Sequence, residues 1–259
     1  MTAATDAIAR LAASPRLLVA LDFDGTLSPL EDEPMDARML PAARDAVDAL
    51  VAAPETVVAF VSGRSLVDLR VIAEHDDGSR VLLAGSHGAE FWIPGEGVVS
   101  HGEDESDVAL RDALRAHAER ATAHLGGVWI EPKTFGFGVH TRRADPADAA
   151  DANRIVDGIV AAEAPHWRRR TGHNIVEYAF RHEGKDSAVA ELRRRVGATA
   201  VLFAGDDVTD EDAIASLGPE DVGVRVGEGP SAAAVRVPDI AALAALLAGL
   251  AGERTRAVG

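Results

Sequence analysis

The feature that most constrains the fold is a short apolar run that ends in two carboxylates. Residues 17–21 read Leu-Leu-Val-Ala-Leu, and Asp22 and Asp24 follow almost at once. A run that is apolar at every position predicts a strand buried on both faces, as in a parallel sheet covered by helices on both sides. Ligands of such sheets bind beyond the carboxyl ends of the strands, so the two acids are candidate catalytic residues.

The same order of strand and helix repeats along the chain. Further buried strands are predicted over 56–61, 81–84, 199–204 and 222–226, and helices over 41–52, 65–74, 185–196 and 210–217. This alternation implies right-handed crossovers between parallel strands. We therefore predict an α/β protein with a doubly wound, mostly parallel sheet of the Rossmann-like kind.

The middle of the chain follows a different order. Strands flank Pro94-Gly95 as a hairpin, helices are predicted over 104–124 and 146–162, and further strands over 128–131, 135–140 and 174–178. Strand pairs between helices favour a separate α/β module with an antiparallel sheet. We expect a core of residues 1–102 and 181–259, interrupted by a smaller inserted α/β domain of residues 103–180. Trp92 and Trp129 are interpreted as core residues.

Charge and composition exclude several classes of function. The chain has 26 Lys and Arg against 42 Asp and Glu, a formal net charge of −16, which argues against nucleic acid or an anionic membrane as the main partner. Without cysteine there is no disulfide, thiolate nucleophile or Cys-ligated metal. The apolar run 240–250 is too short to span a bilayer, and no signal peptide is indicated. We expect a cytoplasmic protein.

The strongest chemical signal is Asp22-Phe-Asp24-Gly25-Thr26. A nucleophilic Asp22 needs a metal to offset its charge, and a second carboxyl group, Asp24, can protonate a leaving oxygen. An ordinary turn explains Asp24-Gly25, but not an apolar strand that leads into two acids.

A second acidic group follows the strand predicted over 199–204. Five acids occur within residues 206–212, and oxygen-only ligands favour Mg²⁺. A helix capped by Thr209 explains Asp210 and its neighbours. It leaves Asp206 and Asp207 as candidate metal ligands.

Phosphate-binding groups follow other strands. Ser62, the amide of Gly63 and Arg64 can donate to a phosphoryl group, and Lys185 can offset the charge of its transition state. His87 is either a substrate contact or a structural histidine in a glycine-rich turn. Each signal is weak alone, but together they fall in order at the ends of successive elements.

The set resembles the haloacid-dehalogenase (HAD)-type phosphatases. The motifs of that superfamily are D-x-D-x-T, a Ser or Thr after the second strand, a Lys and a final acidic pair, and they match Asp22, Asp24, Ser62, Lys185 and Asp206. The resemblance implies a HAD-type core and makes the inserted domain a cap for substrate recognition. More narrowly, residues 21–30, 61–65, 84–90 and 205–213 are similar to the trehalose-6-phosphate phosphatase family.

The inserted domain carries shorter similarities to that family. Residues 131–133, 140–142 and Glu177 are similar to its E-D-K, H-Y-R and G-x-x-x-E motifs. The resemblance implies that Glu131, Lys133, Arg142 and Glu177 contact the distal sugar. This chain has Pro132 and Thr141 where the family usually has Asp and Tyr, and it lacks the Arg-Pro that follows the glutamate. Other sugar phosphates, such as sucrose 6-phosphate or a phosphorylated glycerate glycoside, therefore stay open as substrates.

The resemblance implies Mg²⁺-dependent hydrolysis of trehalose 6-phosphate through an aspartyl-phosphate at Asp22. Asp24 is expected to act as acid and then base. Mg²⁺ is expected on the Asp22 carboxylate, the Asp24 backbone carbonyl and Asp206, with Asp207 or Asp210 acting through water. The expected partner is a small phosphosugar, and a trehalose-phosphate synthase is a candidate protein partner. The alternative from another class is a non-catalytic phosphosugar-binding partner of such a synthase.

Overall fold

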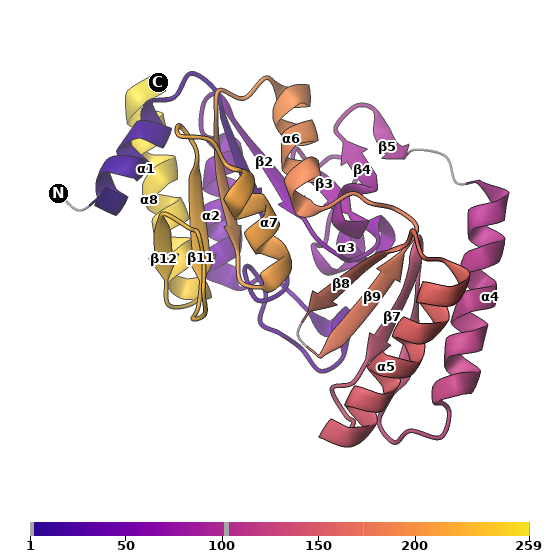
Figure 1. Ribbon diagram of the computed structural model, residues 1–259. Helices are drawn as coiled ribbons and strands as arrows, with labels where there is room; N and C mark the ends of the chain where they lie inside the picture. Colours follow the sequence, from indigo (N-terminus) through magenta and orange to yellow (C-terminus); the bar gives the residue numbers. More distant parts are fainter. Residues whose placement is uncertain (1–2, 101–103, 173, 259) are drawn as a thin grey trace. The chain divides into compact units, whose positions relative to one another are not determined.

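The computed structural model describes residues 3–100, 104–172 and 174–258, and it forms two compact units (Figure 1). The first unit joins Met1–Ser100 with Glu183–Gly259, and the second is His101–His182. The chain thus leaves the first unit, builds the second and returns. None of the described helices combines the length and apolar character needed to cross a lipid bilayer.

The first unit is built on an eight-stranded sheet in the order β12-β11-β10-β1-β2-β3-β4-β5. The strands are β1 (Leu17–Leu21), β2 (Thr56–Val61), β3 (Leu82–Gly85), β4 (Glu90–Ile93), β5 (Gly97–Ser100), β10 (Ala200–Gly205), β11 (Val222–Val226) and β12 (Val235–Val237). The pairs from β12 to β3 are parallel, while β4 and β5 extend the edge as an antiparallel hairpin. The predicted α/β fold with a mainly parallel sheet is confirmed, and β12 is an addition.

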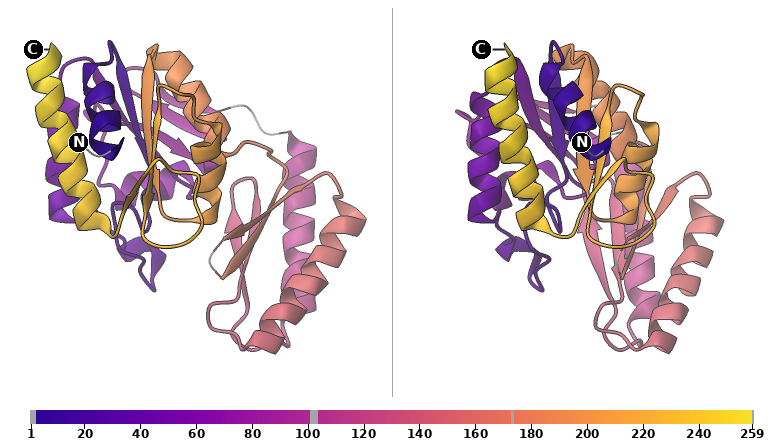
Figure 2. Two further views of the ribbon diagram at one scale, coloured as in Figure 1. Left: turned by 60° about the vertical axis from the view of Figure 1, so that its left-hand side comes forward. Right: turned by 90° about the vertical axis from the view of Figure 1, so that its left-hand side faces the viewer.

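Helices cover both faces of this sheet (Figures 1 and 2). Helices α1 (Ala3–Ala13), α2 (Pro41–Ala52), α3 (Leu66–Ile72) and α8 (Ile240–Val258) contribute to one apolar cluster, and α6 (Lys185–Val196) and α7 (Val208–Ser216) to the other. Two short 3-10 turns are η1 (Pro34–Asp36) and η2 (Ser86–Gly88). Helix α1 was not predicted, and α8 extends beyond the apolar run 240–250.

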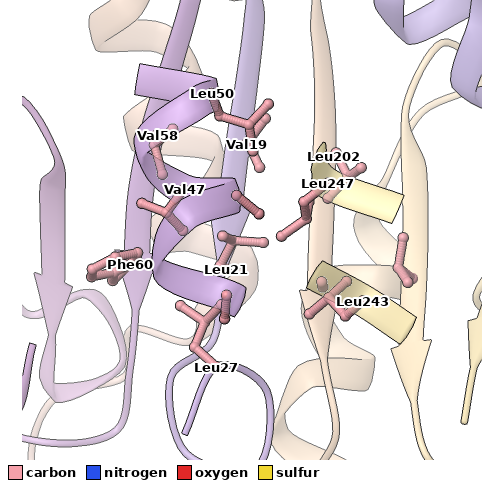
Figure 3. Close-up of a cluster of buried hydrophobic side chains, with 14 of the residues drawn as sticks. Val19, Leu21, Leu27, Val47, Leu50, Val58, Phe60, Leu202, Leu243 and Leu247 are labelled. Atoms are coloured by element: carbon pink, nitrogen blue, oxygen red, sulfur yellow. The ribbon is translucent and has the colours of Figure 1, made fainter. Parts of the chain in front are cut away.

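The burial of β1 explains why its sequence does not alternate. Val19 and Leu21 pack into the cluster on the face of α2 and α8, where Leu50 and Leu247 lie (Figure 3). Leu18 and its second neighbour Ala20 belong to the opposite cluster. Both faces are apolar because both are covered by helices.

The register of β1 sets up the functional edge of the sheet. Leu21 lies opposite Ala204 on β10 and Phe60 on β2, and all three strands run in the same direction. Their carboxyl ends therefore lie at one edge. The acids that follow β1 and β10 are brought together there although about 180 residues separate them.

The second unit has a four-stranded antiparallel sheet in the order β6-β7-β9-β8. Its elements are α4 (Glu105–Thr122), β6 (Trp129–Lys133), β7 (Gly136–His140), α5 (Pro146–Glu163), β8 (Arg168–Gly172) and β9 (Ile175–Ala179). Phe137, Val139, Val176 and Tyr178 are buried, as are residues on one side of each helix, namely Leu114 and Ala118 of α4 and Ala152, Val156 and Val160 of α5. The Tyr178 hydroxyl donates to Asp157 Oδ1 of α5 at 2.6 Å, which ties this helix to the sheet.

Candidate active site

The loop after β1 folds tightly around its own backbone. The amide of Asp22 donates to the carbonyl of Ala204 at 2.9 Å, and the carbonyl of Phe23 accepts from the amides of Leu27 and Ser28. Asp22 is buried at 4% exposure. The loop therefore fixes the carboxylate of Asp22 beyond the end of the strand.

Gly25 and Thr26 join this loop to the one after β10. Gly25 has a φ of +77°, and a Cβ atom there would collide with the carboxylate of Asp206. The Thr26 hydroxyl lies 3.3 Å from Asp22 Oδ2 and 3.1 Å from Asp206 Oδ1. Glycine is therefore required both by the turn and by the approach of Asp206.

Lys185, at the first position of α6, lies in the centre of the acidic group. Its Nζ donates to Asp22 Oδ1 and to Asp210 Oδ1, each at 2.6 Å. Lys185 is 4% exposed and Asp210 is 0% exposed. Burial alone would lower the pKa of Lys185, but the charges of Asp210 and Asp22 outweigh it and raise this pKa. Lys185 is therefore an ammonium whose charge stabilises both carboxylates.

The acids of this cluster nevertheless outnumber Lys185, their cationic partner. Burial, together with the charges of Asp210 and Asp206, raises the pKa of Asp22 well above its usual value, although Lys185 acts in the opposite direction. Burial and the charge of Asp210 raise the pKa of Asp206 to about 6. Because a nearby cation would favour the charged forms, this cluster suits a positive ligand.

Three of these carboxylates are arranged to hold a divalent cation. Asp22, Asp206 and Asp210 each offer an oxygen, and the three oxygens lie within 4.8 Å of one another. Asp207 is placed differently from the expectation, because it is the N-cap of α7 and its Oδ1 accepts from the amide of Val208 at 2.7 Å. The interpretation of Thr209 as the N-cap is therefore wrong.

Asp210 was expected as a ligand only through water, yet it is the residue that joins the cluster. At the third position of α7, its Oδ2 accepts from the amides of Asp206 at 3.0 Å and Asp207 at 2.9 Å. A Cβ atom on Gly205 would collide with its side chain. The spacing of four residues from Asp206 is the sequence signal, but it is indistinguishable from an acid in the first turn of a helix.

Asp24 is paired with Arg64 from the loop after β2. Arg64 Nε donates to Asp24 Oδ2 and Nη2 to Oδ1, each at 2.6 Å, in a two-pronged ion pair. Ser62 is buried, and its Oγ accepts from the amide of Arg64 at 3.2 Å. The loop therefore presents Ser62 and Arg64 together and orients the second carboxylate of the D-x-D motif.

His87 packs against this loop. A Cβ atom on Gly63 would lie 2.7 Å from the imidazole of His87, and the His87 amide donates to the carbonyl of Ser62 at 2.9 Å. His87 is buried and has a φ of +58°. These contacts favour the structural interpretation of this histidine; its contact with substrate stays a prediction.

The remaining candidates lie in the second unit, on the sheet face that carries Trp129. Glu131, Gly138 and Glu177 lie in one row across β6, β7 and β9. Lys133 Nζ lies 3.0 Å from Glu131 Oε2 and 3.4 Å from Glu177 Oε1. Because Gly138 has no side chain, it leaves space between Glu131 and Glu177. The structure thus brings Glu131, Lys133 and Glu177 together.

His140 and Trp129 complete this face. His140 Nε2 lies 2.5 Å from Glu131 Oε2, and its ring stacks on Trp129 with centroids 4.4 Å apart. Trp129 is 37% exposed, so its interpretation as a core residue is wrong, whereas Trp92 is buried at 3%. Arg142 is exposed in the turn after β7. No sequence pattern marked Trp129 as a partner of His140.

Burial alone would raise the pKa of Glu131, but the hydrogen bond from His140 and the charge of Lys133 outweigh it and lower this pKa. Burial alone would lower the pKa of Lys133, while Glu177 and Glu131 raise it. Glu131 is therefore a carboxylate and Lys133 an ammonium at neutral pH, and Lys133 is shared between the two acids of the row.

Comparison with known proteins agrees with this arrangement. The family model for trehalose-phosphatase matches residues 20–239. The chain is 34% identical over 251 residues to an uncharacterized glycosyl hydrolase of Mycobacterium tuberculosis, covering 88% of this chain and 18% of that protein. It is 36% identical over 206 residues to the trehalose-phosphate phosphatase of Mycobacterium avium, covering 75% of this chain and 50% of the relative. The chain thus spans at most about half the length of these relatives.

The fold comparison covers nearly the whole chain. The C-terminal domain of C. albicans trehalose-6-phosphate phosphatase superimposes with a TM-score of 0.81 and 21% identity, covering 97% of both chains. At this identity the match concerns the fold. Because the family model covers residues 20–239, which include Asp22, Lys185 and Asp210, the chain belongs to the trehalose-phosphatase family.

Proposed function

We propose that this chain is a Mg²⁺-dependent phosphatase that hydrolyses trehalose 6-phosphate to trehalose and inorganic phosphate. The buried cluster in which Lys185 holds Asp22 beside Asp206 and Asp210 carries the proposal. Membership in the trehalose-phosphatase family supports the substrate class.

Asp22 is the proposed nucleophile. One of its carboxylate oxygens attacks phosphorus, the bond between phosphorus and the sugar oxygen breaks, and Asp24 gives that oxygen a proton. Water then attacks the phosphorus of the aspartyl-phosphate and passes a proton to Asp24. The bond between phosphorus and the Asp22 oxygen breaks, which releases phosphate and restores both carboxyl groups.

The carboxylates of Asp22, Asp206 and Asp210 would hold the cation, directly or through water, and their oxygen-only set suits Mg²⁺. When bound, Mg²⁺ neutralises the charge of the phosphoryl group and its nucleophile. We place Asp210 in this role instead of Asp207, whose carboxylate caps α7. A contribution from the Asp24 backbone carbonyl stays a prediction.

Lys185, Ser62 and Arg64 position the reacting groups. An ammonium has three protons, and two of those on Lys185 point to Asp22 and Asp210, so the third is available to a phosphoryl oxygen. The Ser62 hydroxyl and the Gly63 amide are the other proposed phosphoryl donors. Arg64 orients the carboxylate of Asp24 through its two hydrogen bonds.

We propose that the second unit is a cap that recognises the distal glucose. Glu131, Lys133 and Glu177 offer donors and acceptors to sugar hydroxyl groups from one sheet face, with Arg142 as a further contact. Carboxylates that are already paired with Lys133 suit an uncharged sugar, because they can accept hydrogen bonds from hydroxyl groups without the added cation that the first cluster needs.

The decisive experiment measures phosphate release from trehalose 6-phosphate, sucrose 6-phosphate, glucose 6-phosphate and p-nitrophenyl phosphate, with Mg²⁺ and with EDTA. We expect a strong preference for trehalose 6-phosphate that EDTA abolishes. Equal rates on all four compounds would retain the core chemistry and reject the role of the second unit. Protein with Asp22→Asn, prepared in parallel, controls for contaminating phosphatases.

A non-catalytic phosphosugar-binding protein is the competing interpretation. Binding alone requires no nucleophile, and the retention of Asp22 with its buried lysine argues against it. Folded protein that binds trehalose 6-phosphate but releases no phosphate from any of the four compounds would establish it. A cytoplasmic location and association with a trehalose-phosphate synthase stay predictions.

A further inference from the structure

Two arginines lie next to each other on neighbouring strands of the main sheet, and they hold different parts of the chain. Arg225 on β11 is in register with Arg236 on β12. Arg236 is exposed, and it donates to the carbonyls of Gly227 and Gly229, each at 2.7 Å. Arg225 is buried at 8% exposure.

Arg225 joins two loops through its terminal nitrogens. Nη1 donates to the backbone carbonyl of Asp207 at 3.0 Å and lies 3.4 Å from Glu211 Oε1. Nη2 donates to the carbonyl of Glu228 at 2.9 Å. The other oxygen of Glu211 accepts from the amide of Ala232 at 3.0 Å. The first turn of α7 is thereby fixed to residues 228–232.

That first turn and the loop before it carry two of the three carboxylates of the cation site, Asp210 and Asp206. Asp210 Oδ2 accepts from the amides of Asp206 and Asp207, and the Asp207 carbonyl accepts from the Asp210 amide at 3.3 Å. A shift of the Asp207 peptide therefore changes the positions of both Asp206 and Asp210. Groups that orient metal ligands typically affect affinity by about 10- to 100-fold.

We propose that Arg225 is a positioning residue for the cation site and sets its affinity for Mg²⁺ by fixing the peptide of Asp207. The proposal rests on the proposed function for the identity of the ion. It does not depend on turnover, because it concerns binding of the ion to protein without substrate.

The direction of the change in Mg²⁺ affinity distinguishes a positioning role of Arg225 from a purely electrostatic one. Arg225 is a cation beside an acidic loop, so removing its charge should, by Coulomb's law alone, strengthen the binding of a divalent cation. Loss of the hydrogen bonds to Asp207 and Glu228 should weaken binding, because the ligands are no longer held at their spacing. The proposal requires the second result.

The test is isothermal titration of Mg²⁺ into the full chain without substrate, with Arg225→Met, Arg225→Lys and Arg236→Met compared with the unchanged protein. We expect Arg225→Met to raise the Kd for Mg²⁺ by about 10-fold. Arg225→Lys retains the charge but not the two-pronged geometry, and it should raise the Kd by a smaller factor. Arg236→Met, the matched control, should leave the Kd within about 2-fold because the hydrogen bonds of Arg236 go to carbonyls of the loop after β11.

Unchanged or tighter Mg²⁺ binding by Arg225→Met would overturn the proposal, as would equal weakening by Arg225→Met and Arg236→Met. If Arg225→Met does not fold, as judged by circular dichroism, Arg225→Lys decides the matter, because an unchanged Kd in that variant is equally contrary. Activity at saturating Mg²⁺ should be largely restored in Arg225→Lys. Unchanged protein that binds Mg²⁺ but hydrolyses nothing would refute the proposed function and leave this inference standing.

Discussion

The two units each surround a lysine with carboxylates, but they balance the charges differently. In the first unit Lys185 faces Asp22 and Asp210, with Asp206 beside them, and the pKa values of Asp22 and Asp206 are raised. In the second unit Glu131 is contacted by both Lys133 and His140, and the pKa of Glu131 is lowered.

This difference indicates what each site is built to bind. A cluster with more acids than bases is stable in its ionised form only with an added cation, which suits a metal and a phosphoryl group. A cluster whose acids are already paired has little need of an ion, and it offers fixed hydrogen-bonding groups to a neutral ligand. The difference supports the proposal that the first unit carries the chemistry and the second recognises the sugar.

The largest effect should come from Asp22→Asn, since an amide cannot act as the nucleophile. We expect kcat to fall by at least about 10³-fold on trehalose 6-phosphate and on p-nitrophenyl phosphate alike. Steady-state phosphate release measures both. An unchanged melting temperature would show that the fold is retained, and turnover near that of the unchanged protein would reject Asp22 as the nucleophile.

Removing each lysine tests the charge comparison directly. Lys185→Met leaves buried acids without their partner, and we expect a loss of about 3 kcal/mol in the free energy of unfolding without metal. Millimolar Mg²⁺ should recover much of this loss, because the ion takes over the role of the ammonium.

Lys133→Met is the matched variant in the second unit. Its stability loss should be about 1 kcal/mol or less, because the Lys133 side chain is partly exposed, and Mg²⁺ should not recover it. Urea unfolding of both variants with and without Mg²⁺ measures the difference. Equal recovery in the two variants would show that the two clusters do not differ in the way we infer.

The first site was largely predictable from the sequence because local pattern and topology agree there. A strand apolar at every position predicts burial, and the ends of parallel strands share one edge, so Asp22, Asp24 and Asp206 were expected to meet. The role of Asp210 was less predictable. The carboxylate of Asp210 has its position because α7 begins after the N-cap Asp207. Whether Asp207 or Thr209 caps the helix depends on tertiary contacts, such as the hydrogen bond from Arg225 to the Asp207 carbonyl.

The second unit was less predictable for a related reason. Strand β8 begins with Arg168, Arg169 and Arg170, and it has no apolar alternation that could mark it as a strand. Its place at the edge of the sheet depends on pairing with β9, which the sequence does not encode locally. The exposure of Trp129 also depends on its neighbour His140 on β7, whose ring stacks on it, and the identity of residue 129 alone does not reveal this.

A smaller and selective effect should follow from Glu131→Ala. Loss of a carboxylate that accepts hydrogen bonds from sugar hydroxyl groups should raise KM for trehalose 6-phosphate by about 10-fold. KM for p-nitrophenyl phosphate, which contains no sugar, should change little. Glu163→Ala is the control, because Glu163 is an acid of the same unit that pairs with His117 on α4. Equal losses on the two substrates would contradict the assignment of sugar recognition to the second unit.

The smallest effect is on stability as a function of pH. The pKa of Glu131 in the folded protein lies below its usual value of 4.5, so its ionised form stabilises the fold at neutral pH, and this contribution is lost as pH falls through the lowered pKa. We expect Glu131→Gln to be less stable than the unchanged protein by less than about 1 kcal/mol at pH 7, because the side chain is partly exposed. The gap should close toward pH 4 and below, where the unchanged protein also becomes protonated at this position. Urea unfolding of both proteins across this pH range measures the difference in the free energy of unfolding. A difference that widens on acidification would mean that the acids of the second unit, like those of the first, have too few cationic partners.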